Sequence, residues 1–262
     1  MQLILEKCFD MIESINNKIG SMEVVTDTFD IDASGTMKLS YLSNLMLKCA
    51  EIHATQRGWG MMQLNEGGNT WVLSRAVIEF TDDVPGENEH IILDTWVDSV
   101  MRLFTVRKFR FRNAEGRVFG YSHTVWAMIN RESRKPVILV SSGGGNLTEW
   151  VDNTIECPIA GHSKISVNAD SPSDIVKVKY SDIDMNGHMN SCRYIEHVLD
   201  LFSADFHSKH KIRRFEIAYM AECLCGEELS LFCEQVSNND YNVEICKNDT
   251  NEVACRSKIV FF

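Results

Sequence analysis

The sequence lacks an apolar run of about 20 residues, the length that a helix needs to cross a bilayer. Its first residues mix acidic with apolar positions, so the basic start and apolar stretch of a signal peptide are also missing. Neither membrane insertion nor secretion nor organelle import is therefore expected. Residues 1–21 are expected to form a dispensable N-terminal extension without an assigned function.

Basic residues are too few to balance the acidic ones. Lys and Arg number 26 against 37 Asp and Glu, which gives a formal net charge of −11. Binding to nucleic acid is not expected, because phosphate contacts need a basic surface. Two basic runs, at 102–112 and 209–214, stand out from this acidic background. Each is open to interpretation as a solvated surface or as a site for an acidic partner.

The nine cysteines lack the close, even spacing of a small disulfide-rich secreted protein. They are interpreted as free thiols in a reducing compartment, which predicts a cytoplasmic location. Cys223 and Cys225 have no second cysteine pair or histidine cluster nearby, so no metal site is expected. The glycines at 143–145 are not followed by Lys-Ser/Thr, which excludes a phosphate loop, and no cofactor is predicted.

A long internal repeat is present. DIDASGTMK at 30–38 returns as DIDMNGHMN at 182–190, and each copy runs into a segment with helical spacing of apolar residues. Four strand-like segments follow each helix, between 70 and 129 in the first half and between 213 and 262 in the second. Each half is therefore predicted to be an α+β unit in which an antiparallel sheet wraps round its leading helix.

The two copies of the repeat differ at positions that can carry chemistry. Asn186 and His188 stand in the second copy where the first has Ser34 and Thr36. Helix capping alone would explain an isolated Asp or Asn. An amide and a titratable imidazole beside the carboxylate of Asp184 favour an acid–base site in the second half.

DIDMNGHMNSCRYIEHVLD, with YMAEC at 219–223 and VWAMINRESRKP in the first half, resembles the acyl-acyl carrier protein thioesterases of plants and bacteria. The resemblance covers nearly the whole chain after Met22. It implies two tandem hotdog domains, in agreement with the repeat. We expect an N-terminal hotdog domain with the acyl-chain pocket at 22–150, a linker at 151–175 and a catalytic C-terminal hotdog domain at 176–262.

The resemblance implies that the chain hydrolyses the thioester of fatty acyl-acyl carrier protein, which releases the fatty acid and ends chain elongation. By position in the motif, it implies catalytic roles for Asp184, Asn186, His188 and Glu222, and it matches Cys223 to a cysteine proposed as a nucleophile. Thioester hydrolysis needs a base, a donor for the oxyanion and an acid for the thiolate. We expect Asp184 and Glu222 to act as bases on water or substrate. Asn186 is expected to position the water or the carbonyl by hydrogen bonding, and His188 to shuttle the proton. A helix beginning near His188 would offer N–H donors to the oxyanion.

Several alternatives stay open. Cys223 fits a buried, small apolar residue better than a nucleophile. A hotdog thioesterase acting on acyl-coenzyme A would need similar chemistry, and a non-catalytic acyl-binding hotdog protein is a rival of another class. A homodimer also stays open. Because acyl carrier protein is acidic, the basic run that contains Lys209, Lys211, Arg213 and Arg214 is the expected docking site for it.

Overall fold

A computed structural model describes residues 18–139 and 147–262, so the expected extension at 1–21 lies almost entirely outside the described residues. The first half contains β1 (Gly20–Val25), α1 (Leu39–Thr55), α2 (Met61–Glu66), β2 (Asn69–Phe80), β3 (His90–Val100), β4 (Phe104–Asn113) and β5 (Val118–Asn130). The second half contains β6 (Asp174–Lys177), α3 (Ser191–Leu199), α4 (Ala204–Lys209), β7 (Ile212–Tyr219), β8 (Glu228–Ser237), β9 (Asp240–Lys247) and β10 (Val253–Phe261). Short 3-10 helices lie at Thr28–Asp30, Leu147–Trp150 and Tyr180–Asp182.

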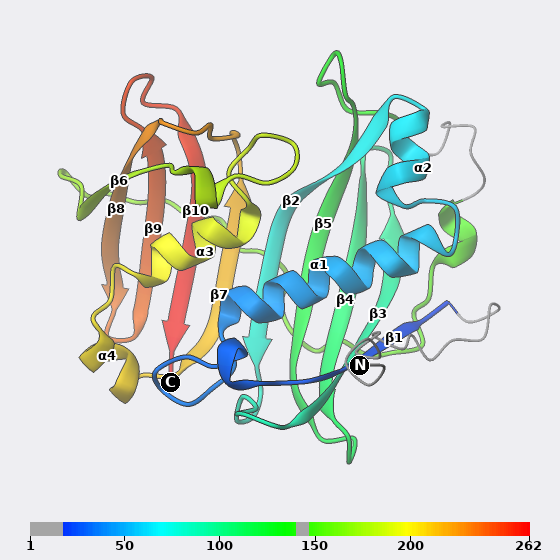
Figure 1. Cartoon of the computed structure of the whole chain (residues 1–262), viewed down its shortest axis with the longest axis horizontal. Helices are drawn as coiled ribbons and strands as arrows, with labels where there is room; N and C mark the ends of the chain where they lie inside the picture. The colour runs from blue at the N-terminus through cyan, green and yellow to red at the C-terminus, as the bar shows by residue number, and fades with distance from the viewer. Residues whose placement is uncertain (1–17, 140–146) are drawn as a thin grey trace, which may run out of the picture.

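The strands form one antiparallel sheet in the order β1-β3-β4-β5-β2-β7-β10-β9-β8-β6 (Figure 1). Counted from the outer edge to the centre, the first half has the order β1-β3-β4-β5-β2 and the second half has β6-β8-β9-β10-β7. In both halves the first strand in the chain is at the edge and the second is at the centre. The two halves meet where β2 pairs with β7, with Arg75 opposite Ala218 and Glu79 opposite Arg214. The repeat in the sequence is therefore a structural duplication about the centre of the sheet.

Both long helices lie against the same face of the sheet (Figure 1). In α1 the buried residues Leu42, Leu45, Met46 and Cys49 recur at helical spacing, which directs one apolar stripe toward the sheet. α3 contacts α1, and its buried residues Tyr194, Ile195 and Val198 belong to the same hydrophobic core. No helix in the described part of the chain is long and apolar enough to cross a membrane.

The strands predicted from the sequence match β2 to β5 and β7 to β10, with one difference that concerns the site. The strand expected over 213–224 ends at Tyr219. It ends there because the amides of Met220 and Ala221 both turn to the carbonyl of Ala254. Glu222 and Cys223 consequently lie in an irregular segment that leaves the sheet.

Each edge strand begins before the residue at which we expect its hotdog domain to start. β1 begins at Gly20, because Gly20 and Ser21 pair with Thr95 and Asp94 of β3. β6 begins at Asp174, inside the expected linker, and pairs with β8. β6 has four residues and no alternation of burial, so it does not stand out in the sequence.

The segment between the halves crosses the sheet face opposite the helices. Phe215 and Ile217 of β7 pack into the helix-facing core, so Glu216 points to the opposite face. There its carboxylate accepts from the amide and hydroxyl of Ser163, at 2.6 and 2.8 Å. Arg214 donates to the carbonyls at 160 and 161. The expected linker thus bonds to β7 of the second half through Ser163 and the carbonyls at 160 and 161, and its start bonds to Val97 of the first half.

Candidate active site

The loop before α3 is held in shape by one carboxylate. Asp184 Oδ1 accepts from the amides of Asn186, at 2.8 Å, and His188, at 3.3 Å. The Asp184 amide donates to the His188 carbonyl at 2.8 Å, and Gly187 takes φ 83°, which a glycine adopts without strain. The loop therefore presents the side chains of Asn186 and His188 on a closed backbone turn.

The first half repeats this loop but has Ser34 and Thr36 in place of Asn186 and His188. Asp32 Oδ1 accepts from the amides of Ser34, at 2.8 Å, and Thr36, at 3.3 Å, and Gly35 takes φ 81°. The aspartate thus has a loop-holding role in both copies. Asn186 and His188 are what distinguish the second loop.

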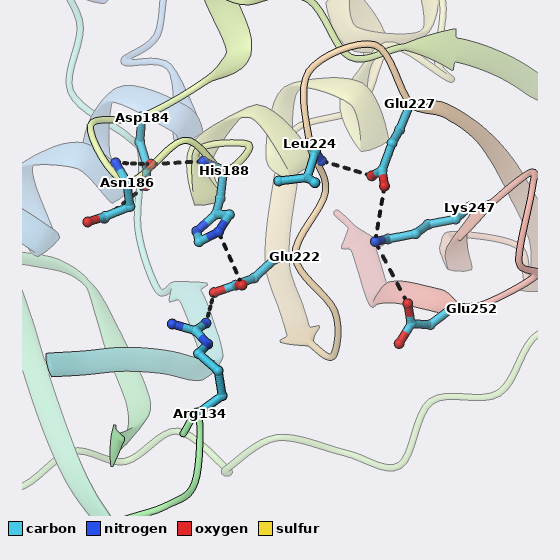
Figure 2. A network of polar contacts seen from close by, with 9 residues as sticks. All are labelled: Arg134, Asp184, Asn186, His188, Glu222, Leu224, Glu227, Lys247 and Glu252. Atoms are coloured by element: carbon cyan, nitrogen blue, oxygen red, sulfur yellow. Dashed lines mark hydrogen bonds and ion pairs between the residues drawn. The ribbon is translucent and has the colours of Figure 1, made fainter. Parts of the chain in front are cut away.

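His188 meets a carboxylate that is distant in the sequence (Figure 2). Its Nε2 lies 3.3 Å from Glu222 Oε2, and Glu222 also forms an ion pair with Arg134. Arg134 follows β5 in the first half, so the two halves meet at this carboxylate. His188 is less exposed than Glu222, with side-chain exposures of 28 % and 43 %. The arrangement places an imidazole in contact with a carboxylate that is accessible to water.

The counterpart of Glu222 in the first half is apolar. Met189 donates its amide to the Cys223 carbonyl at 2.8 Å, and Met37 donates in the same way to the Pro85 carbonyl, also at 2.8 Å. Val84 therefore stands at the position of Glu222. The duplicated unit keeps the full polar set in the second half.

The sequence pattern did not identify Arg134 as a site residue. It lies in the segment RESRKP, where its charge resembles that of any solvated turn. One local sign exists: Arg134 has φ 57°, an unusual value for a residue with a side chain. That value is visible only in the structure.

The helix expected to begin near His188 is present, three residues further along the chain. α3 begins at Ser191, and Asn190 caps it by accepting from the Cys192 amide at 2.9 Å. The amides of Gly187 and His188 are occupied within the loop. Ser191 lines the cavity, and its amide has no hydrogen-bond acceptor among the described residues. The first amide of a helix is a candidate donor to a developing oxyanion. The side-chain amide of Asn186, which lines the same cavity, donates to Asp184 Oδ2 at 3.5 Å.

Cys223 lies beneath the site rather than in it. Its side chain is fully buried, and burial raises the pKa of its thiol. A thiol that resists ionisation is a poor nucleophile at neutral pH. The geometry brings Asp184, Asn186, His188 and Glu222 to one surface and leaves Cys223 in the core.

The four polar residues stand on the wall of a cavity of about 890 Å³. The cavity extends from the second half into the first, beneath the C-terminal part of α1. Its far wall is rich in large apolar side chains, including those of Trp59, Trp71, Trp126, Leu147 and Trp150. This volume and lining suit a small organic ligand with an extended apolar part.

The basic run at 209–214, which is the expected docking site for the carrier, is largely paired with acidic residues. Three of its residues form ion pairs, namely Lys209 with Asp205, Lys211 with Asp83, and Arg214 with Glu79 and Glu216. The run adjoins the start of β7, whereas Glu222 follows its end, and eight residues of strand span about 25 Å. Arg213 is exposed and has no ion pair among the described residues. The docking role of this run stays a prediction.

Residues 20–141 match the family model described as the Acyl-ACP thioesterase N-terminal domain, and residues 166–261 match the Acyl-ACP thioesterase C-terminal domain. The crystal structure of an acyl-ACP thioesterase from Bacteroides thetaiotaomicron is 46 % identical, with a TM-score of 0.88, over 95 % of this chain and 100 % of that one. The 12:0-ACP thioesterase from Umbellularia californica has a TM-score of 0.81 at 15 % identity, over 95 % and 99 % of the two chains. These likenesses confirm the predicted fold of two tandem hotdog units.

Curated plant relatives are more distant. A chloroplastic palmitoyl-acyl carrier protein thioesterase from Gossypium hirsutum is 24 % identical over 211 residues, which cover 75 % of this chain and 50 % of the relative. A chloroplastic oleoyl-acyl carrier protein thioesterase 2 from Arabidopsis thaliana is 21 % identical over 214 residues, which cover 76 % and 58 %. The chain thus spans 50 % and 58 % of the length of these two relatives.

Proposed function

Because the chain belongs to the acyl-ACP thioesterase family, we propose that it hydrolyses the thioester of a fatty acyl chain on acyl carrier protein. The products are a free fatty acid and the carrier thiol, so the reaction ends chain elongation. The observation that carries the proposal is the contact of His188 with Glu222 on the wall of a cavity large enough for an acyl chain.

In the proposed reaction a water molecule attacks the thioester carbonyl. Glu222, together with His188, takes a proton from the water molecule while the water oxygen bonds to the carbonyl carbon. Asn186 and the Ser191 amide donate to the oxygen that gains charge. The C–S bond then breaks, and the proton returns through His188 to the departing thiolate. Asp184 keeps the loop closed, and it is also a candidate for a general base.

Cys223 takes no covalent part in this scheme. Its burial and the raised pKa of its thiol support a packing role. Direct attack by water needs one addition and elimination at the carbonyl. A cysteine route would need two, because it passes through an acyl-enzyme that water must then hydrolyse.

The partner in this proposal is acyl carrier protein, and its docking surface is left unassigned. The eight cysteines in the described ranges are free thiols, which supports a reducing, cytoplasmic location. A homodimer is compatible with the fold and plays no part in the scheme, because both halves of the site come from one chain.

The test is release of free acid and thiol from matched acyl-carrier and acyl-coenzyme A thioesters of graded chain length. We expect kcat/KM to be higher for the carrier substrates. Equal rates with coenzyme A would assign the chain to acyl-coenzyme A hydrolysis. Binding of acyl chains without hydrolysis of either substrate would assign it to the non-catalytic class.

A further inference from the structure

Arg107 lies on the buried face of β4, where an apolar side chain is expected. Phe109 and Phe111 share its face of the strand and are 1 % and 0 % exposed. Lys108 and Arg110 point to the opposite face, where they form ion pairs with Asp98 and Asp94. Arg107 is only 8 % exposed, and it lines the cavity. A cation therefore stands in the wall that should meet an acyl chain.

The polar contacts of Arg107 are to neutral groups. Its Nη1 donates to His53 Nδ1 and to Thr95 Oγ1, both at 3.1 Å. His53 Nε2 lies 3.0 Å from the Lys18 carbonyl, so Nε2 carries the proton and Nδ1 accepts. Burial and two nearby arginines lower the pKa of His53 to about 2, which keeps the ring neutral. Arg107 has no carboxylate partner in the described part of the chain.

The unused side of the guanidinium has the shape that recognises a carboxylate. Nε and Nη2 form the edge from which arginine donates two parallel hydrogen bonds. Within the described ranges, neither nitrogen has a hydrogen-bond partner. Nη1 is meanwhile fixed by His53 and Thr95, so the free edge is held in place.

The surrounding wall adds positive charge. Arg57 and Arg131 also line the first-half part of the cavity, and Glu51 is the one carboxylate there among the described residues. One oxygen of Glu51 already accepts from the Met61 amide at 2.8 Å. Burial lowers the pKa of Arg107 to about 10, which leaves it charged at neutral pH. This part of the cavity is cationic in a chain whose net charge is −11.

We propose that the free edge of Arg107 binds a second carboxylate on the acyl chain, so that the preferred substrates are thioesters of dicarboxylic acids. A plain alkyl chain that reached Arg107 would displace water and leave the buried cation without a partner. A chain ending in a carboxylate would satisfy it with two charge-assisted hydrogen bonds. This inference rests on the proposed function, because it names the substrate class of the same cavity.

The test compares pantetheine thioesters matched in length, one ending in a methyl group and the other in a carboxylate. At the length that reaches Arg107, we expect kcat/KM to favour the carboxylate by about tenfold or more. Arg107→Met should reverse this preference, and Arg107→Lys should retain part of it. Lys108→Met, which removes a charge from the opposite face of the same strand, should leave it unchanged.

Three results would overturn the proposal: a preference for the methyl chain at every length, a ratio unaffected by Arg107→Met, or a stronger preference for a matched hydroxyl-terminated chain. If Arg107→Met does not fold, the proposal is tested by the ratio of kcat/KM for the carboxylate and methyl chains in the wild type and in Arg107→Lys.

Binding separates this proposal from the proposed function. Free dicarboxylic acids should raise the melting temperature of the wild type more than matched monocarboxylic acids, and Arg107→Met should abolish the difference. Such stabilisation without hydrolysis of any thioester would sustain the role of Arg107 and contradict the thioesterase function. Hydrolysis of thioesters, with equal stabilisation by dicarboxylic and monocarboxylic acids, would support the thioesterase function and contradict the role of Arg107.

Discussion

Glu222 lies between His188 and Arg134, with one carboxylate oxygen 3.3 Å from the imidazole and the other paired with the guanidinium. The histidine belongs to the loop before α3, the glutamate to the segment after β7, and the arginine to the other half of the chain. The contacts among these three side chains join residues that are distant in the sequence. The site consequently depends on the meeting of two hotdog units.

Arg134→Ala is expected to lower kcat/KM by about tenfold, because Glu222 loses the partner that fixes its second oxygen. Arg131→Ala is the matched control, since Arg131 lines the same cavity but forms no ion pair with Glu222. Steady-state hydrolysis of an acyl-carrier substrate measures both. Equal losses in the two variants would mean that general surface charge, rather than contact with Glu222, is responsible.

Asp184→Ala should lower turnover by about 100-fold, because the loop that carries Asn186 and His188 loses its closing acceptor. Asp32→Ala opens the equivalent loop of the first half and should change turnover by less than about twofold. Circular dichroism must show that both variants fold. Near-normal hydrolysis by a folded Asp184→Ala protein contradicts the assignment, and a matching loss in Asp32→Ala would attribute the effect to stability.

Cys223→Ala should keep most of the activity and lose about 1 kcal/mol of unfolding free energy, because only packing is removed. Turnover and urea denaturation measure the two quantities. Complete loss of activity in the variant, with an acyl-cysteine trapped in the wild type by mass spectrometry, would establish the covalent route instead.

His53 makes stability depend on pH. Its pKa is lowered from 6.5 to about 2 by burial, Arg107 and Arg57, so on acidification the unfolded chain takes up the proton before the folded one. The stability that depends on the neutral ring is complete above about pH 6.5 and is lost as the pH falls below it, by up to about 1.4 kcal/mol per unit.

Urea denaturation at pH 7 and pH 5 tests this dependence. His53→Gln should lose about 2 kcal/mol less than the wild type between the two pH values. His90→Gln alters an exposed histidine paired with Glu23 and should follow the wild type. Parallel curves for wild type and His53→Gln would show that this ring does not govern the acid sensitivity.

The repeat in the sequence predicts the architecture because both halves keep their local signals. Alternation in β4 and helical spacing in α1 are strong enough to place both elements within a few residues. β6, at four residues, gives no such signal, since its place depends on pairing with β8. Short edge strands are set by tertiary contacts more than by pattern.

Without the family resemblance, the sequence predicts the site only where the duplicated loops differ. Asn186 and His188 stand out against Ser34 and Thr36, but Arg134 does not stand out, because its partner comes from the other half. Arg107 is hidden in a basic run whose alternate members face opposite sides of a strand. Only the packing of β4 beneath α1 separates it from Lys108.

A double-mutant cycle on the hydrolysis of acyl-carrier thioester tests the central claim most directly, that His188 and Glu222 act as one acid–base unit. His188→Gln and Glu222→Gln should each lower kcat/KM by about 100-fold, and the double variant should be little worse than either one. Losses that multiply in the double variant, about 10⁴-fold in total, would show that the two side chains act independently and would contradict the account.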